Sequence, residues 1–453
     1  MNTFCNIIFK INNLLWGNFT VFLILIAGIF LTVRCGFIQF KNPAAVLKAT
    51  LFVGKSNMTK DKKSISNLQA LSTALGASMG TGNIIGVAAA ISIGGSGAVI
   101  WMILSAFIVM AFAFTENVLG VVYKNKYSKN SKTSGAILYI SKGLNCKKLA
   151  VFYAVACLCA SFGTGNITQS YSAVSSLSEI GISPVCSGAV LTVFIALAVF
   201  KGGSFIAVIS EKIVPLTSLV YIICAFTCII IYGNNISDVL QDTISSAFGF
   251  SQAAGGFTGT LISLSMTTGI RRGIFSNEAG MGSSVFAHTS TDCTDPCTMG
   301  LWAIVEVFID TVLSCTLTAL VILCTGADKS GLDGAAMVIE AFRRCLGDYA
   351  VYFIAAANTL FAFASIAGWY YYGEKCTDYL SDKPYLKFFY RIMYSAVVFA
   401  GAFVSSSLIW AVSDILNALV MFPNLAAILI LSSEAVPVSR KFTQRALTSK
   451  KHN

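Results

Sequence analysis

Long apolar runs alternate with short polar, lysine-rich segments along almost the whole of this chain. A helix that crosses a lipid bilayer needs about 20 mostly apolar residues. The first run contains no small-residue cleavage site and is followed directly by Arg34, so we interpret it as a retained span rather than a signal peptide. Spanning helices are predicted at eleven places: 18–35, 67–94, 97–122, 149–178, 184–201, 206–232, 254–287, 298–324, 349–373, 389–408 and 410–433.

The composition agrees with a membrane protein and excludes two other classes. Of the 453 residues, 56% are hydrophobic and 11% are charged, whereas an ordinary soluble domain carries about 25% charged residues. So few charges cannot cover the surface of soluble domains of this total length. Soluble globular and disordered structures are therefore excluded, and the sequence predicts an all-α polytopic membrane protein.

The positions of the charges predict the orientation in the membrane. Cytoplasmic loops of membrane proteins are rich in Lys and Arg. If the N-terminus lies outside and the C-terminus in the cytoplasm, the loop 34–66 and most of the 31 Lys and Arg residues fall inside. The few that then lie outside are Lys10, Lys329, Arg343 and Arg344. This topology in the cell (cytoplasmic) membrane explains the net charge of +11 without a nucleic-acid partner.

Two predicted spans, 67–94 and 254–287, are crowded with Gly, Ser and Thr. If the first span is set aside, they are the first and sixth of ten. Interrupted helices at matching places in two halves are typical of inverted-repeat transporters with a site near the membrane centre. Small residues can instead serve close helix packing, which we favour for isolated glycines. However, Gly76, Gly80 and Gly82 each cost about 1 kcal/mol relative to Ala in a helix, so a break is predicted there.

An interrupted helix offers two kinds of free backbone group at membrane depth. Its N–H groups can hold a carboxylate, and its carbonyl groups can hold a hard cation such as sodium. Gly80 and Gly82 allow close approach to the backbone, Thr73 and Thr81 add hydroxyls, and Asn83 adds an amide oxygen. This set lacks the soft or nitrogen-rich ligands that favour a transition metal. The pattern therefore favours binding of an amino acid together with a cation.

Acidic side chains also fall inside or beside the predicted spans: Glu116, Glu278, Glu306 and Asp310. Charged groups at membrane depth are costly, so they are treated as functional by default. In the structural interpretation, which we favour, each one pairs with Arg271 or Arg272 or caps a helix end. The other interpretation gives Asp310 a role in proton coupling.

Motifs of the common enzyme classes are missing from the sequence. It contains no His-Glu-x-x-His, no Gly-x-Ser-x-Gly and no Walker loop. The glycines from Gly80 to Gly86 superficially resemble a dinucleotide-binding loop, but the third one comes one position late. With only two His, and cysteines scattered through apolar runs, a metal cluster is not indicated. We therefore predict neither an enzyme nor a bound cofactor.

Several stretches resemble the alanine/glycine:cation symporter family, whose members are sodium-coupled amino-acid carriers. The most specific is 272–283, which reads RGIFSNEAGMGS and resembles the family's RGLFSNEAGMGS. Residues 81–87 read TGNIIGV and are similar to its TGNIAGV, and residues 361–374 are similar to its FAFSTxxGWxYYGE. The similarity runs from about Asn18 to Pro437, nearly the whole chain.

The resemblance implies a fold and a set of site residues. The fold is of the LeuT type, in which two inverted five-helix repeats here follow one extra N-terminal helix. The predicted parts are the extra helix with a cytoplasmic loop (1–66), the first repeat (67–232), the second repeat (233–433) and a basic cytoplasmic tail (434–453). The substrate-binding candidates are Thr73, Gly80, Thr81, Gly82, Gln169, Tyr171 and Trp369. The candidates for sodium, as the coupling ion, are Gly76, Met79, Asn83 and Ser365.

Two departures from the family pattern leave the substrate and the ion open. Residues 169–172 read QSYS where the family reads QxNS, so the ring of Tyr171 replaces an amide. The family's Ser-Thr pair is Ala364-Ser365 here, and the lost hydroxyl weakens the second sodium site or shifts it toward protons. The leading prediction is a sodium-coupled importer of alanine or glycine that works by alternating access in the lipid bilayer. The alternatives are a serine or glutamine carrier, a proton-coupled carrier and a non-transporting amino-acid sensor.

Overall fold

The computed structural model describes residues 2–41, 43, 46, 67–127, 133–249, 258–291 and 293–449. Within these ranges the chain is helical and contains no β-strand, as the long apolar runs predict. The first half contains α1 (Asn2–Leu15), α2 (Asn18–Arg34), α4 (Asn67–Ser78), η2 (Thr81–Asn83), α5 (Ile85–Gly94), α6 (Gly97–Tyr127), α7 (Ala136–Leu138), η4 (Tyr139–Gly143), α8 (Lys147–Phe162), η5 (Gly163–Ile167), α9 (Thr168–Ser178), α10 (Pro184–Lys201) and α11 (Gly203–Ile231). The second half contains η6 (Gly233–Asn235), α12 (Ile236–Phe248), α13 (Thr258–Asn277), α14 (Ser284–His288), α15 (Pro296–Val307), η7 (Phe308–Cys315), α16 (Thr316–Cys324), η8 (Ala327–Ser330), α17 (Gly334–Leu346), α18 (Tyr349–Leu380), α19 (Pro384–Ala400), α20 (Ser406–Ile430) and α21 (Ser432–Ser449).

Eight helical segments of the described chain are long and apolar enough to cross a membrane. They are Thr3–Arg34, Gly97–Tyr127, Lys147–Ser178, Pro184–Lys201, Phe205–Ile231, Pro296–Cys324, Tyr349–Leu380 and Ser407–Ile430. The predicted spans 67–94 and 254–287 are each divided into two shorter helices, and α19, in the predicted span 389–408, has only 17 residues. The exact number of eleven spans therefore stays a prediction.

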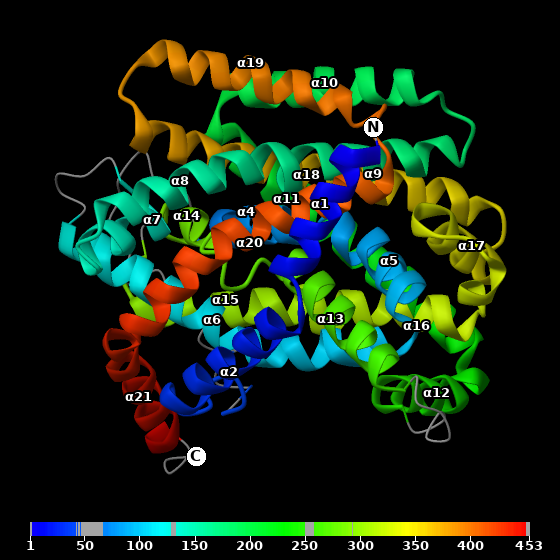
Figure 1. Cartoon of the computed structure of the whole chain (residues 1–453), viewed down its shortest axis with the longest axis horizontal. Helices are drawn as coiled ribbons and strands as arrows, with labels where there is room; N and C mark the ends of the chain where they lie inside the picture. The colour runs from blue at the N-terminus through cyan, green and yellow to red at the C-terminus, as the bar shows by residue number, and fades with distance from the viewer. Residues whose placement is uncertain are drawn as a thin grey trace.

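The long helices form a layered bundle around the interrupted ones. Figure 1 shows α10 and α19 side by side along one edge of the molecule, with α8 and α18 beneath them. On the other side of the centre, α6 packs against both α13 and α15. The short helix α4 contacts α18 on one side and α15 on the other, so it lies in the middle of the bundle. Elements from both predicted repeats therefore surround the first interruption.

Both interruptions predicted from the glycine-rich spans are confirmed. The first helix ends at Ser78, passes through an extended Gly80 (φ −107°, ψ −155°) and the short segment η2, and resumes at Ile85. The second ends at Asn277 and resumes at Ser284. Between them Gly280 and Gly282 have φ of +84° and +71°, a conformation that glycine adopts without steric cost.

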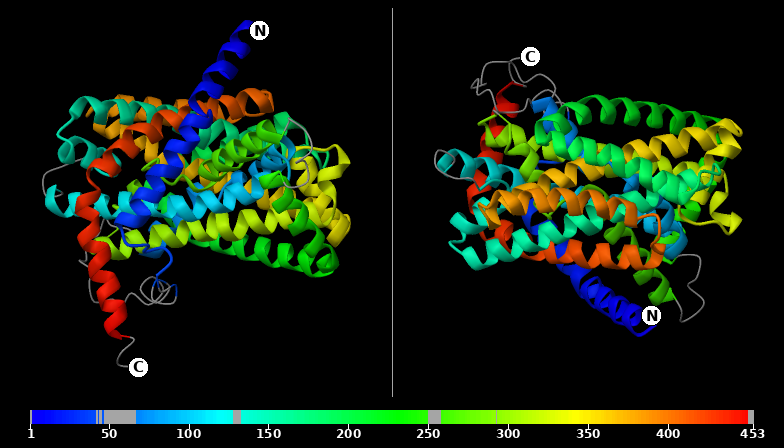
Figure 2. Two further views of the ribbon diagram at one scale, coloured as in Figure 1. Left: turned by 60° about the horizontal axis from the view of Figure 1, so that its bottom comes forward. Right: turned by 90° about the horizontal axis from the view of Figure 1, so that it is seen from above.

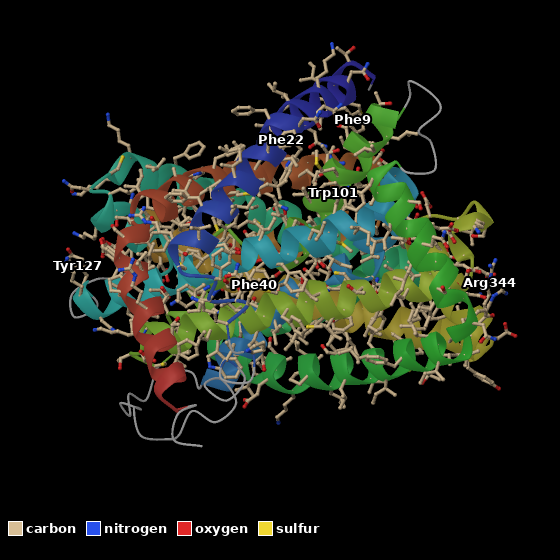
Figure 3. The ribbon with its side chains drawn as sticks, turned by 90° about the horizontal axis from the view of Figure 1, so that it is seen from below. Phe9, Phe22, Phe40, Trp101, Tyr127 and Arg344 are labelled. Atoms are coloured by element: carbon tan, nitrogen blue, oxygen red, sulfur yellow. The ribbon has the colours of Figure 1, made fainter. Side chains whose placement is uncertain are left out.

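The two ends of the bundle differ in their charged side chains. Figure 3 shows Tyr127 and Arg344 at opposite ends of the molecule. Lys126 and Lys142 both lie over the Tyr127 ring, 5.4 Å and 6.0 Å from its centre. The Tyr127 end is therefore the lysine-rich one, as expected for the cytoplasmic side. Its placement in a membrane stays a prediction.

The terminal helices leave the bundle on opposite sides, as Figure 2 shows for α1 and α21. The division of the chain into four parts stays a prediction. Several basic residues that were used to predict the orientation lie outside the described residues: Lys48, Lys55, Lys60, Lys62, Lys63, Lys129, Lys132, Lys450 and Lys451.

Candidate functional site

The first interruption meets the side chain of Gln169 from α9. The Thr81 amide donates a hydrogen bond to Gln169 Oε1 at 3.1 Å, and the Thr81 hydroxyl donates to the same oxygen at 2.9 Å. Both residues are buried. The backbone N–H that the break leaves without a helical partner therefore bonds to a side-chain oxygen. A substrate carboxylate oxygen could take the place of Gln169 Oε1 at this donor.

Gly80 and Gly82 let neighbouring helices approach this backbone. A Cβ on Gly80 would overlap the Ser365 hydroxyl and would lie 2.8 Å from Gln169 Oε1. A Cβ on Gly82 would lie 3.3 Å from the ring of Phe275 on α13. A side chain at Gly80 therefore cannot be accommodated without displacing groups of both α9 and α18.

Ser365, on α18, joins the same interruption from the other side. Its hydroxyl donates a hydrogen bond to the Gly76 carbonyl at 2.9 Å. The neighbouring Ala364 methyl lies 3.6 Å from where a Gly76 Cβ would stand, so the missing family hydroxyl would also have been close. Met79, the next candidate, is 2% exposed, and its sulfur accepts a weak hydrogen bond from Ser218 at 3.7 Å. The structure thus brings Gly76 and Ser365 together as predicted.

Asn83 contacts the carboxylate of Asp310, which lies on η7. The Asn83 side-chain N–H₂ donates to the Asp310 carbonyl and to Asp310 Oδ1, each at 2.8 Å. The other carboxylate oxygen accepts hydrogen bonds from the hydroxyls of Ser276 at 2.8 Å and Thr311 at 2.7 Å. Asn83 Oδ1 is buried and has no hydrogen-bond partner among the described residues.

This cluster has the donor chemistry of a hard-cation site. It combines a carboxylate, an unpartnered amide oxygen and hydroxyl oxygens, with the Cys315 thiol 3.4 Å from the Ser276 hydroxyl as a soft group beside them. Asp310 is completely buried, and within the described chain no Lys or Arg forms a salt bridge with it. A bound cation would supply the positive charge that a buried carboxylate needs.

Asp310 and Ser276 are the residues that the sequence did not assign to an ion. The sequence marks Asp310 as a charge at membrane depth and favours its pairing with Arg271 or Arg272, with proton coupling as the alternative, and does not predict its contact with Asn83. Ser276 lies at the end of α13, 34 positions before Asp310. Ser276 belongs to the distinctive stretch 272–283, but its contact with Asp310 depends on how α13 and η7 pack and could not be read from that stretch.

Three substrate-binding candidates remain to be placed: Trp369, Thr73 and Tyr171. Trp369 is fully buried and donates from its indole N–H to Glu278 Oε1 at 2.6 Å, beside the second interruption. Thr73 is buried on α4, about two helical turns before the first break. Tyr171 lies two residues after Gln169 on α9, and residues two apart do not face the same way on a helix. The structure therefore does not bring the Tyr171 ring to the face that carries Gln169.

In the described part of the chain, none of the four acidic residues forms an ion pair with Arg271 or Arg272, so the expected pairing is wrong. Both arginines pair with Asp414 of α20 instead, with nitrogen–oxygen distances of 3.5 Å from Arg271 and 2.5 Å from Arg272. No side chain of a described residue caps the start of α14, so the alternative of capping a helix end does not apply to Glu116. Its carboxylate accepts the backbone N–H groups of Gly280 at 3.4 Å and Gly282 at 3.0 Å, inside the second interruption.

The Arg272–Asp414 pair lies close to the first interruption. The Arg272 guanidinium stands 4.5 Å from the ring centre of Trp410, and that ring contacts Phe275 at 4.8 Å between centres. Phe275 is the ring that faces Gly82. The ion pair therefore joins α13 to α20 directly beside the candidate binding site. The sequence did not single out Asp414, although one acid inside an apolar run is a signal of function.

The chain is similar over nearly its whole length to known proteins. The model of the "Sodium:alanine symporter family" matches residues 1–453. The sodium/alanine symporter AgcS of Methanococcus maripaludis is 34% identical over 450 residues, which is 97% of this chain and 98% of that protein. The probable sodium/glutamine symporter GlnT of Bacillus subtilis is 34% identical over 442 residues, which is 97% of this chain and 91% of that protein.

The solved structure of MhsT in complex with L-phenylalanine shares the fold at only 11% sequence identity. The TM-score is 0.55, and the match covers 85% of this chain and 99% of that chain. This likeness confirms the all-α, LeuT-type fold predicted from the sequence.

Proposed function

Because this chain belongs to the sodium:alanine symporter family, a family of transporters and not of enzymes, we propose that it carries a small neutral amino acid together with sodium. Alanine and glycine are the leading substrates. The observation that supports this most is the meeting of three groups at one interrupted helix. They are the Thr81 donors, the Asn83–Asp310 cluster and the Gly76–Ser365 contact.

The substrate carboxylate would bind at the Thr81 amide and hydroxyl. Both donors bond to Gln169 Oε1 in this structure, so a carboxylate at this place would require Gln169 to turn away. The Gln169 N–H₂ group could then donate to the carboxylate, because an amide side chain carries both a donor and an acceptor. The close packing around Gly80 and Gly82, where an added Cβ would overlap the Ser365 hydroxyl at the first and lie 3.3 Å from the Phe275 ring at the second, favours a small substrate.

Sodium would bind at two places beside the substrate. At the first, Asn83 Oδ1 and Asp310 supply oxygen ligands, and the unpartnered amide oxygen supports this assignment. At the second, the Gly76 carbonyl and the Ser365 hydroxyl would turn from each other to the ion, with the Met79 carbonyl as a further ligand. Because sodium is cargo here, no resident cofactor is required.

Transport would follow from movement of the half-helices around a fixed site. The Arg272–Asp414 pair, which joins α13 to α20 beside the site, would restrain this movement while it is formed. We place the protein in the cell membrane, with the N-terminus outside and the C-terminus in the cytoplasm.

A carrier of a larger neutral amino acid is the second candidate, because a relative of similar identity is described as a probable sodium/glutamine symporter. Tyr171 and Ala364, where this chain departs from the family pattern, motivate two further alternatives: a proton-coupled carrier and an amino-acid sensor.

Thermal stabilisation of the purified protein separates these candidates. A ligand that binds only the folded state adds about 2.7 kcal/mol of stability at a hundredfold excess over its Kd. We expect alanine and glycine to raise the Tm in sodium but not in potassium. A sodium-independent rise would favour the proton-coupled or sensor alternatives. A rise with glutamine alone would move the substrate assignment, and no rise with any neutral amino acid would contradict the proposal.

A further inference from the structure

A second buried carboxylate, Glu306 on α15, connects the inner halves of both interrupted helices. Its Oε2 atom lies 3.0 Å from Nε2 of His288, the last residue of α14. Its Oε1 atom accepts a hydrogen bond from the hydroxyl of Ser78, the last residue of α4, at 3.2 Å. All three side chains are at least 96% buried. One carboxylate therefore links three elements through its two oxygens.

The two half-helices that it joins lie toward the lysine-rich end of the bundle. The α14 helix packs on α4, and both labels lie together in the centre of Figure 1. The segment after α14 is tied to the end of α6, where Lys124 donates to the Thr291 carbonyl and Asn125 donates to the Thr294 carbonyl. This is the end that the lysine distribution predicts to face the cytoplasm.

The contacts of Glu306 depend on one another. Among the described residues, His288 is the one basic side chain within 4.0 Å of the Glu306 carboxylate. If α4 moves away from α15, the Ser78 bond is lost, and if α14 moves, the His288 contact is lost. Either movement leaves a buried polar group without a hydrogen-bond partner, which is costly inside a protein. The contacts therefore favour the arrangement in which both half-helices stay together.

We propose that Glu306 is a positioning residue that holds the inner half-helices α4 and α14 against α15 and so keeps the cytoplasmic path closed. Release of these contacts accompanies opening toward the cytoplasm. The inference rests on the proposed carrier function for its meaning in transport. The closure itself can be measured without a substrate.

The test uses Leu75→Cys as a reporter of closure. Leu75 lies on α4, one turn before Ser78, is 7% exposed, and packs with Met299 and Trp302 of α15. The full-length protein in lipid nanodiscs is treated with a water-soluble maleimide. Labelling is followed at this position by peptide mass spectrometry, because the chain has 14 native cysteines. Glu306→Gln removes the charge, and Ser78→Ala removes one contact with the smallest change of volume.

Ser92→Ala is the matched control. The Ser92 hydroxyl bonds to the carbonyl four residues earlier, at Ala88, just as the Ser78 hydroxyl bonds to that of Ala74. Only Ser78 also reaches Glu306. We expect the labelling rate to rise more than about tenfold in Glu306→Gln and about threefold in Ser78→Ala, and to stay at the parent value in Ser92→Ala.

If Glu306 only stabilised the fold, Glu306→Gln and Ser78→Ala would lower the Tm without raising the rate of labelling at position 75. In proteoliposomes, loss of closure reduces the outward-facing population. The KM for external alanine should therefore rise, by a smaller factor than labelling while the open state stays a minority, and the maximal rate should fall less. Parent labelling rates in folded Glu306→Gln and Ser78→Ala proteins would overturn the inference, and so would an equal rise in Ser92→Ala. If labelling rises but no amino acid is bound, the proposed function fails and the closing role of Glu306 stands.

Discussion

The role of Asn83 can be tested with two substitutions that are almost identical in chemistry. Asn83 is 3% exposed and donates two hydrogen bonds of 2.8 Å, to a backbone carbonyl and to a side-chain oxygen, while its own Oδ1 is unpartnered. Asn358 on α18 is also buried. It donates at 2.9 Å to the Ser172 carbonyl and at 2.8 Å to the Ser176 hydroxyl, and its Oδ1 is unpartnered as well.

Asn83→Ala and Asn358→Ala therefore remove the same groups, but only Asn83 is a proposed sodium ligand. A contact between a neutral oxygen and a charged group contributes about 1.5–3 kcal/mol. At 1.4 kcal/mol for each tenfold change, loss of the Asn83 oxygen should raise the half-saturating sodium concentration about 10- to 150-fold. Asn358 lies two helical turns, about 10 Å, from Ser365. Its substitution should change the sodium requirement less than about twofold.

The assay is sodium titration of alanine uptake in proteoliposomes, with the Tm of each purified variant measured in sodium-free buffer. Both variants should lose similar stability in the absence of sodium, because each loses two buried hydrogen bonds. Only Asn83→Ala should show the shifted sodium curve. An unchanged sodium curve for Asn83→Ala, or an equal shift for Asn358→Ala, would refute the assignment of Asn83 as a ligand.

Three further substitutions test neighbouring parts of the site. Gly80→Ala should abolish amino-acid binding, measured by thermal shift, because its Cβ overlaps a serine hydroxyl of α18; Gly233→Ala, where a Cβ meets nothing within 4 Å, should leave binding unchanged. Asp310→Asn removes the buried charge and should weaken sodium binding more than about a hundredfold, which equilibrium binding of radioactive sodium can measure. Asp414→Asn leaves Arg272 buried without its ion-pair partner and should lower the free energy of unfolding by about 3 kcal/mol or more, measured by denaturation in detergent.

The helices and both interruptions could be predicted because they depend on local sequence. Apolar length identifies the long spans, and closely spaced glycines identify the breaks at Gly80 and between Asn277 and Ser284. The number of spans could not be settled in the same way. Both helices of the first interrupted span and α19, with 17 residues, are too short to qualify, and α13 is long enough but too polar.

The contacts within the site could be predicted only in part. The family resemblance predicted that Ser365 and Gly76 share a sodium site, and the two residues are in contact although they lie 289 positions apart in the chain. The partner of Arg272 was not predictable, because it lies 142 positions away on another helix. Glu278 is much closer in sequence, but the chain turns there with φ of +54° and directs the carboxylate to Trp369 and Ser283. The choice of partner therefore depends on helix rotation and on the irregular backbone of the breaks.

Gradient-driven uptake is the most direct test of the proposed function. Proteoliposomes that contain the full-length protein are given radiolabelled alanine or glycine under an inward sodium gradient, with an equal potassium gradient as the control. We expect accumulation above the external concentration only with the sodium gradient, and loss of that accumulation when the gradient is dissipated. Equal uptake in sodium and potassium for every neutral amino acid would contradict sodium-coupled symport.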